Sequence, residues 1–251
     1  MKIGFITDLH YRHAVPGTSP IAKRECRRVG ELLDRCLAAL AAAGVDLLIC
    51  AGDCVDDPEH PLAIEDLASL RDRFAASGLP AIVIPGNHDP APEVFYRILP
   101  QPPRRWRIGP CEIVTFFDDV CEPGSEQSRR SAELLRFMRD ALSDCPADVA
   151  LTVLVQHYVI YPEYSGAGYP HNYANDAEIR AILEGSPRSL LALSGHCHAG
   201  HPLTRHNGVA YFTGRALCER PYPYYVIEIV AGDAPRGHQA RVHELTVPVS
   251  D

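Results

Sequence analysis

Two histidines, His196 and His198, stand one residue apart in the stretch "SGHCHAG" (194–200), directly after an apolar run and a glycine. Imidazole is the side chain that most often binds metal ions in proteins. A single histidine at this point would fit a hydrogen-bonded core residue, but a pair at i and i+2 where a strand ends is typical of a metal site. Further ligands are then expected at the ends of neighbouring strands.

Four other apolar runs also end in polar side chains, namely "FITDLH", "LLICAGD", "IVIPGNHD" and "LVQH". The polar residues that they deliver are Asp8, His10, Asp53, Asn87, His88, Asp89 and His157. In open α/β sheets, functional groups gather beyond the carboxyl ends of the strands. The five segments are therefore expected to meet at one place.

The side chains at these strand ends suit transition metals. Leaving out His88 and Asp89, they comprise two carboxylates, one carboxamide and four imidazoles, with no thiolate. This mixture favours Mn, Fe, Zn or Co over Ca or Mg. Seven ligands are too many for one ion with open positions, whereas two ions about 3.5–4 Å apart, bridged by one carboxylate, would use them all and leave room for a hydroxide and a substrate. The predicted cofactor is a pair of divalent or trivalent transition-metal ions.

The same segments resemble the calcineurin-like metallophosphoesterase family. The family pattern is D-x-H, G-D-x-x-D, G-N-H-[D/E], a lone H after a strand and G-H-x-H. It is present here in that order as "DLH", "GDCVD", "GNHD", "QHY" and "GHCH", between residues 3 and 198. The resemblance implies a first ion held by Asp8, His10, Asp53 and His198. It implies a second ion held by Asp53, Asn87, His157 and His196, with Asp53 as the bridge.

The resemblance also implies an activity, the hydrolysis of phosphate esters by attack of a metal-bridging hydroxide. His88 would lie beside the scissile phosphate as a general acid or transition-state donor, and Asp89 would orient His88 by hydrogen bonding. A protonated imidazole in that position can stabilise developing charge or give a proton to the departing alkoxide. Each imidazole that binds metal should also have its other ring nitrogen fixed by a partner that the sequence does not identify.

The resemblance further implies a small phosphoester as the substrate, with nucleotides as candidates. The modest length, the absence of a large inserted cap and the helical stretch before "GHCH", with Asn175, Ile179, Ile182 and Leu183, are similar to bacterial members that resemble cyclic-nucleotide phosphodiesterases. This similarity favours a phosphodiesterase. A phosphomonoesterase or a nucleotide pyrophosphatase could use the same centre, because the surrounding loops select the substrate. A non-catalytic protein-binding scaffold is the alternative of a different class, but such chains usually have broken ligand sets.

The elements that must position these residues alternate along the chain. Apolar runs predict strands over 2–7, 46–52, 80–86, 111–117, 149–157, 189–195, 208–214, 224–230 and 240–249, and periodic patterns predict helices over 20–43, 62–77, 126–143 and 176–185. The first half therefore reads β-α-β-α-β, with parallel strands covered by helices. The predicted fold is α/β, a four-layer α/β/β/α sandwich of two mixed sheets flanked by helices, forming a single metallophosphoesterase domain over residues 1–251.

Composition excludes several other classes of protein. The formal net charge is −8, which argues against a general nucleic-acid surface, and the basic clusters at 23–28 and 104–107 are interpreted as solvated. No apolar stretch reaches the 18 or more residues of a membrane span. Nine cysteines without paired spacing fit free thiols, and Cys50 and Cys54 are expected to be small buried residues. With no leader-like segment before the first strand, we expect a cytoplasmic protein, and its oligomeric state stays open.

Three features near the predicted site have two interpretations each. The segment 158–173 is rich in Tyr, Pro and Gly, and it forms either one wall of the substrate pocket or a loop packed on its own tyrosines. His201 is either a solvated loop residue or a substrate contact. For Asp56 and Asp57, just past the predicted bridge, we favour loop structure over direct catalysis.

Overall fold

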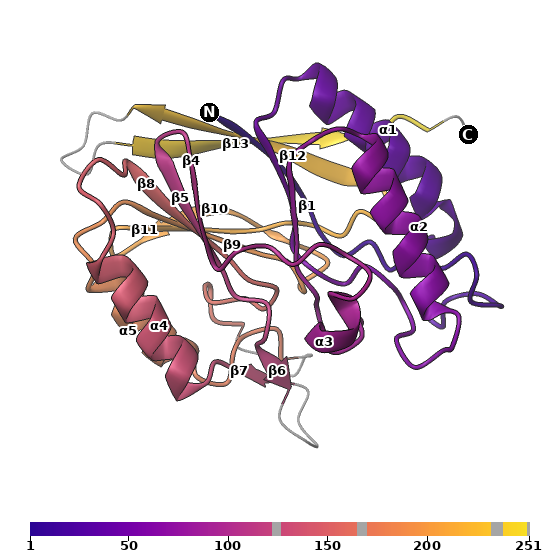
Figure 1. The fold of residues 1–251 in the computed structure, drawn as a ribbon, viewed down its shortest axis with the longest axis horizontal. Coiled ribbons are helices and arrows are strands. Elements are labelled where there is room, and N and C mark those ends of the chain that lie inside the picture. The colour runs from indigo at the N-terminus through magenta and orange to yellow at the C-terminus, as the bar shows by residue number, and fades with distance from the viewer. Residues whose placement is uncertain (122–126, 165–169, 232–237, 250–251) are drawn as a thin grey trace.

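The computed structural model describes residues 1–121, 127–164, 170–231 and 238–249, and within these ranges the chain folds into two sheets with helices on their outer faces (Figure 1). The first sheet has the strand order β13-β12-β1-β2-β3. Its bounds are β1 Lys2–Ile6, β2 Leu47–Cys50, β3 Ala81–Val83, β12 Pro223–Ala231 and β13 His238–Thr246. Strands β1, β2 and β3 are parallel, whereas β12 is antiparallel to β1 and β13 is antiparallel to β12. The predicted β-α-β-α-β order is confirmed, with α1 Val29–Ala42 and α2 Ala63–Ala76 as its helices.

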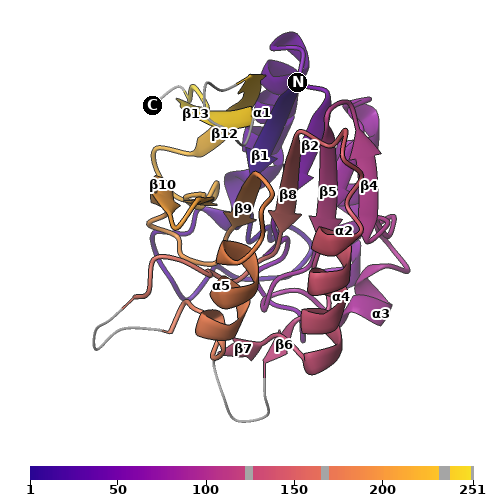
Figure 2. The same cartoon turned by 90° about the vertical axis from the view of Figure 1, so that its left-hand side faces the viewer.

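The second sheet has the order β10-β11-β9-β8-β5-β4. Its bounds are β4 Arg105–Ile108, β5 Cys111–Thr115, β8 Leu151–Val155, β9 Leu190–Ser194, β10 His201–His206 and β11 Val209–Thr213. The four inner strands are parallel, and both edge strands are antiparallel to their neighbours. Helices α4 Ala132–Ser143 and α5 Asp176–Glu184 lie together on the outer face of this sheet (Figure 2). The smaller elements are η1 Cys26–Arg28, α3 Pro92–Phe95, β6 Val120–Cys121 and β7 Ser128–Arg129.

Three apolar clusters hold the layers together. One joins α1 and α2 to the first sheet and includes Leu33 and Leu48, and one fills the space between the two sheets around Phe5 and Val153. The third packs α4 and α5 on the second sheet. Burying apolar surface on both faces of each sheet explains why the inner strands are continuous apolar runs. The predicted four-layer sandwich of two mixed sheets is confirmed.

Two predicted helices begin later than expected, for reasons that lie in their backbone contacts. The helix predicted over 20–43 starts with η1, because the N–H of Glu25 donates to the carbonyl of Cys218 and so leaves the helical path. The helix predicted over 126–143 starts after Ser131, whose hydroxyl accepts from the N–H of Leu134 as an N-cap. Edge strands β4 and β10 were missed, because neither is an apolar run: β4 alternates with Arg105 and Arg107, and β10 contains His201, Pro202 and Arg205.

Candidate metal centre

The carboxyl ends of β1, β2, β8 and β9 meet where the two sheets adjoin. The N–H of His196 donates to the carboxylate of Asp8, 3.1 Å from Oδ2, which ties the end of β9 to the end of β1. The Nδ1 of His157 lies 2.7 Å from the carbonyl oxygen of Ala51, which ties β8 to β2. The polar residues predicted to converge therefore come from both sheets.

The seven predicted ligands form two groups that share one carboxylate. In the first, Asp8, His10, Asp53 and His198 place one ligand atom each within 4.8 Å of one another. In the second, the same holds for Asp53, His157 and His196. Asn87 joins the second group, because its Oδ1 lies 3.1 Å from the Nε2 of His157. We call Asp8, His10 and His198 the first half of the centre. We call Asn87, His157 and His196 the second half, and Asp53 lies between the two.

The imidazoles of the first half are held by carboxylates that leave Nε2 directed into the centre. Asp56 lies 3.4 Å from the Nδ1 of His10, and Glu219 lies 2.5 Å from the Nδ1 of His198. The two Nε2 atoms approach each other to 3.0 Å. A carboxylate on Nδ1 fixes the tautomer that presents an Nε2 lone pair and raises the basicity of the ring. Two lone pairs at this separation suit a shared cation.

Asp56 and Glu219 were not predicted to act at the site. Asp56 belongs to the quoted "GDCVD" but was interpreted as loop structure, and it is buried with its carboxylate against His10. Glu219 carried no signal, since it follows His198 by 21 residues and reaches it only after β10 and β11 have paired. For His10, His198 and His157, the expectation of partners behind the ligand imidazoles is nevertheless met, by these two carboxylates and by the carbonyl of Ala51.

The backbone at the centre adopts a rare conformation. Four of the six non-glycine residues with positive φ in the described chain are Asp8, His10, Asp53 and His196, with φ between 45° and 66°. Such conformations cost on the order of 1–3 kcal/mol each and persist where the surrounding structure enforces them. Here they turn consecutive side chains sharply at the strand ends, so that both Asp8 and His10 reach the same point.

Glycines let the strand ends approach one another at the centre. A Cβ at Gly86 would lie 2.3 Å from the Oδ1 of Asp53, and one at Gly195 would lie 2.0 Å from the Oγ1 of Thr7. A Cβ at Gly52, where φ is +98°, would lie 2.5 Å from the Nδ1 of His157. Close packing around the ligand side chains therefore requires glycine at positions 52, 86 and 195, which are the glycines of the three motifs.

Charges at the centre shift the ionisation of its members. Burial lowers the pKa of His10 to about 4, which keeps the ring neutral as a metal ligand must be. Burial would also lower the pKa of His157, but the Asp53 carboxylate outweighs it and raises that pKa to about 9. Burial disfavours the charged form of Asp53, yet His157 holds its pKa well below the usual range. The donor set fits metal ions, since a cation on Nε2 of His157 would replace the proton that Asp53 now stabilises.

His88 lines the cavity over the centre, whereas Asp89 has a different part from the one expected. The Nδ1 of His88 lies 3.1 Å from the carbonyl oxygen of Asp56, which fixes this nitrogen as the donor. The carboxylate of Asp89 accepts from the backbone N–H groups of Cys54, Val55 and Gly86 at 2.8–3.0 Å. The prediction that Asp89 orients His88 is corrected: the Asp56 carbonyl holds the ring, and Asp89 joins the two loops.

A cavity of about 440 Å³ opens above the centre. Its lining comprises Ile21, Lys23, Arg24, Asp53, Asn87, His88, His171, His196, Cys197, His198 and Ala199. Arg24 belongs to the cluster 23–28 that was expected to be solvated, and that interpretation is wrong for it, because only 11% of its side chain is exposed. His171 was missed by residue, although it lies in the segment 158–173 that was singled out.

The tyrosines of segment 158–173 separate into two places. Tyr164 lies edge-on to His171 with ring centroids 5.4 Å apart, beside the cavity. Tyr161 stacks on His206 at 4.5 Å, packed against the second sheet. Tyr169 lies outside the described residues. His171 of this segment thus lines the cavity, whereas Tyr161 packs on aromatic residues of the second sheet.

His201 lies on β10 rather than in the loop of the ligands. Its Nδ1 is 3.0 Å from the carbonyl of Pro202, and it is absent from the cavity lining in the part of the chain that the structure describes. Cys50 and Cys54 are fully buried, as expected. The eight cysteines whose side chains are described are all free.

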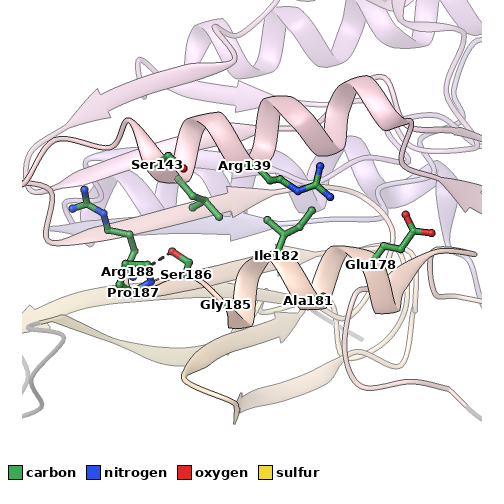
Figure 3. A pocket seen from close by; sticks show the side chains of 10 residues that line it. Arg139, Ser143, Glu178, Ala181, Ile182, Gly185, Ser186, Pro187 and Arg188 are labelled. Carbon is green, nitrogen blue, oxygen red and sulfur yellow. Dashed lines mark hydrogen bonds between the residues drawn. The ribbon is translucent and has the colours of Figure 1, made fainter.

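A larger cavity, of about 720 Å³, lies between α4 and α5 on the far side of the second sheet (Figure 3). Leu142 and Ile182 line it together with Arg139, Glu178 and Arg188. Arg139 and Glu178 extend from the two facing helices. The residues that line this cavity include no cluster of metal-ligating side chains. The convergence of titratable groups, and not cavity size, therefore places the chemistry at the metal centre.

The site defines a dinuclear metallohydrolase, with two groups of ligands around a shared carboxylate and a histidine donor beside them. The family model of the calcineurin-like phosphoesterases matches residues 1–200. The chain belongs to this family, and it is a metal-dependent hydrolase of phosphoesters whose two clusters can hold the two ions on which the family depends. A search of curated protein sequences found no match.

Solved structures share the fold at low sequence identity. A dimetal phosphatase from Danio rerio is 15% identical with a TM-score of 0.76, and the match covers 99% of each chain. GAP50 of Plasmodium, described as the anchor in the inner membrane complex, is 12% identical with a TM-score of 0.62 over 99% of this chain and 89% of that one. The purple acid phosphatase PPD1 of yellow lupin is 11% identical with a TM-score of 0.61, over all of this chain and 52% of that one. These likenesses confirm the fold.

No described helix has the length and apolar character needed to cross a membrane.

Proposed function

We propose that this chain is a phosphodiesterase with two ions at the centre. The first would be held by Asp8, His10, Asp53 and His198, and the second by Asp53, Asn87, His157 and His196. The observation that carries the proposal is the shared position of Asp53 between two groups of imidazoles, and the Nδ1 atoms of His10, His157 and His198 are held from behind. When bound, two such ions activate water near neutral pH and clamp phosphate oxygens. Small phosphoesters, with nucleotides among them, are the proposed substrates.

His88 supplies the proton or the hydrogen bond that the leaving group needs. Because its Nδ1 is held by the carbonyl of Asp56, Nε2 is the ring nitrogen left for a ligand in the cavity. A protonated Nε2 can donate to the departing alkoxide, and such transfer typically contributes about 10²–10⁴-fold. The backbone N–H of His88 also donates to Asp53 at 2.8 Å, which couples the position of the donor to the bridge.

The cavity supports a diester more than a monoester. It extends beyond the ligand residues to Ile21 in one segment and to Cys197 and Ala199 in another, so a phosphoryl group at the centre can carry a substituent on more than one oxygen. His171, with the ring of Tyr164 beside it, offers an aromatic wall for a base or aryl group. A phosphomonoesterase or nucleotide pyrophosphatase would use the same ligands.

The eight free cysteines support a cytoplasmic location as part of this proposal, because reduced thiols are typical of that compartment. The intact ligand set supports hydrolysis over a scaffold role.

The test is hydrolysis of bis(p-nitrophenyl) phosphate beside p-nitrophenyl phosphate, by protein that has been chelated and then supplied with Mn²⁺. We expect metal-dependent cleavage with a higher kcat/KM for the diester. The matched control is His88→Ala with its bound metal measured. A preference for the monoester would contradict the diesterase assignment, and cleavage that is unaffected by chelation would contradict the metal centre itself.

A further inference from the structure

The dipeptide Lys23–Arg24 brings two cations to the cavity above the metal centre. Both residues line this cavity, although the chain as a whole is acidic, with a formal net charge of −8. They precede η1 and belong to no helix or strand, so their position is set by side-chain contacts. Those contacts reach the two carboxylates that support the first half of the centre.

Arg24 is fixed against the back of a ligand imidazole. Its Nη1 lies 3.3 Å from the Oδ1 of Asp56 and 3.3 Å from the Nδ1 of His10. Both contacts are made by the same nitrogen. The Nε of Arg24 is buried and has no hydrogen-bond partner in the part of the chain that the structure describes. The guanidinium is thus held in place by Asp56 at the wall of the cavity that Arg24 lines.

Lys23 repeats this arrangement at the second imidazole. Its Nζ lies 3.1 Å from the Oε2 of Glu219, whose other oxygen contacts His198. The side chain of Lys23 is 65% exposed, so its ammonium remains open to the cavity. One short segment therefore places a cation beside each of the two carboxylates that support the imidazoles of the first half.

The cations that contact the two supporting carboxylates outnumber them, because three basic side chains face Asp56 and Glu219. Asp56 is the shared partner of Arg24 and Arg12, the latter with Nη1 at 3.2 Å, so one carboxylate faces two guanidinium groups. Lys23 and Glu219 balance each other. The single negative charge of a simple phosphodiester would lie at the metal centre. Such a substrate has no second anionic group to pair with the additional cation.

We propose that Lys23 and Arg24 bind a second anionic group of the substrate, next to the phosphoryl group at the metal centre. This inference rests on the proposed function, and it narrows the substrate class to phosphodiesters with an anionic substituent on one arm. Charge-assisted bonds from arginine to carboxylate or phosphate are the strong ones in proteins. Prior fixation of the guanidinium by Asp56 reduces the entropy lost when the anion binds.

The test uses two substrates that differ only in this charge, phenyl p-nitrophenyl phosphate and 3-carboxyphenyl p-nitrophenyl phosphate. The Mn²⁺-loaded wild type should show a kcat/KM roughly 10-fold or more higher for the carboxylate, as a charge-assisted bond predicts. In the K23Q/R24Q double variant, this ratio should fall towards 1. A ratio near 1 in the wild type, or one that survives in the double variant, would overturn the proposal.

Arg12→Gln is the matched control. Arg12 contacts the same carboxylate as Arg24 but is not among the described residues that line the cavity. Its loss disturbs Asp56 to a similar extent, so both substrates should be affected alike and the ratio should stay as in the wild type. A change in ratio equal to that of the K23Q/R24Q variant would show that the preference arises through Asp56, and would also overturn the proposal.

Binding separates this proposal from the proposed function. If the metal-loaded wild type cleaves neither ester, the phosphodiesterase assignment fails. Calorimetric titration of the same two esters into the wild type and the double variant then still measures the preference as a ratio of Kd values. Loss of a roughly 10-fold preference in the variant supports the anion site, and equal binding in both proteins refutes it.

Discussion

The two halves of the metal centre are built from similar ligands but are supported differently. In the first half, His10 and His198 have the carboxylates of Asp56 and Glu219 behind them. In the second half, the Nδ1 of His157 has the carbonyl oxygen of Ala51 behind it in place of a carboxylate. A carboxylate on Nδ1 places a full negative charge behind the imidazole, which stabilises a bound cation more than a carbonyl dipole does. The first half should therefore hold its ion more tightly, and the second half should exchange its ion more readily.

The charges of the ligands also favour tighter metal binding in the first half. The first half contributes the carboxylate of Asp8, whereas the second half contributes the neutral side chains of Asn87, His157 and His196. Asp53 serves both. Two ions in one centre can thus have unequal affinities without any difference in the number of ligands, because the anionic residues are concentrated on one side.

Replacing the shared carboxylate should have the largest effect. In Asp53→Ala both halves lose their common ligand, and the His88 N–H loses its acceptor. Because metal ions contribute several kcal/mol to catalysis, we expect kcat/KM to fall by about 10³-fold or more. Metal analysis by mass spectrometry should find that the retention of both ions is impaired. Retention of one tightly bound ion would show that the first half is complete without the bridge.

Removal of His88 should separate chemistry from metal binding. His88 is outside both ligand groups that contain Asp53, so His88→Ala should keep the metal content of the wild type. The rate should fall by roughly 10²-fold or more, because a general acid contributes about 10²–10⁴-fold. The loss should grow as the leaving group becomes more basic, which is measured with a series of substituted aryl diesters. If the loss of rate did not depend on the leaving group, His88 would not be a general acid and would act only by stabilising charge.

Changing the supporting carboxylates should affect one half alone. Asp56→Asn and Glu219→Gln keep the shape of the side chain but remove the charge behind His10 or His198. Substitutions of this kind typically cost about 10–100-fold in metal affinity. Competition with a chelator should therefore show weaker binding of the tighter ion, with the weaker ion almost unchanged. If the weaker ion were the one affected, the assignment of the tight site to the first half would be wrong.

The ligands could be predicted from sequence because each follows a strand that had to be buried. Asp53 comes directly after a continuous apolar run. Its neighbours Gly52 and Gly86 belong to the same motifs, and a side chain at either position would clash with His157 or Asp53. The supporting residues could not be predicted in this way. Glu219 and Arg24 lie in irregular segments, and only the pairing of distant strands brings them to His198 and His10.

The prediction of the fold succeeded and failed for the same reasons as the prediction of the site. Buried strands and helices with one apolar face were found at close to their true bounds, since burial fixes their pattern. The edge strand Arg105–Ile108 was interpreted as solvated because Arg105 and Arg107 are charged. Those arginines are paired with Glu112 and Asp148, which the sequence alone does not connect. The sequence thus predicts what burial dictates and misses what individual polar contacts dictate.

The smallest effect is expected from His201, which stands three residues after His198 in the chain. Sequence proximity would make it an additional ligand of the first half, but β10 takes it to the edge of the second sheet, where its Nδ1 faces the carbonyl of Pro202. His201→Ala should therefore leave metal content unchanged and alter the free energy of unfolding by no more than about 0.5 kcal/mol, as is usual for surface substitutions. Loss of an ion would place a further ligand in the first half, and the inequality between the halves would then arise from ligand number as well as from the carboxylates behind the imidazoles.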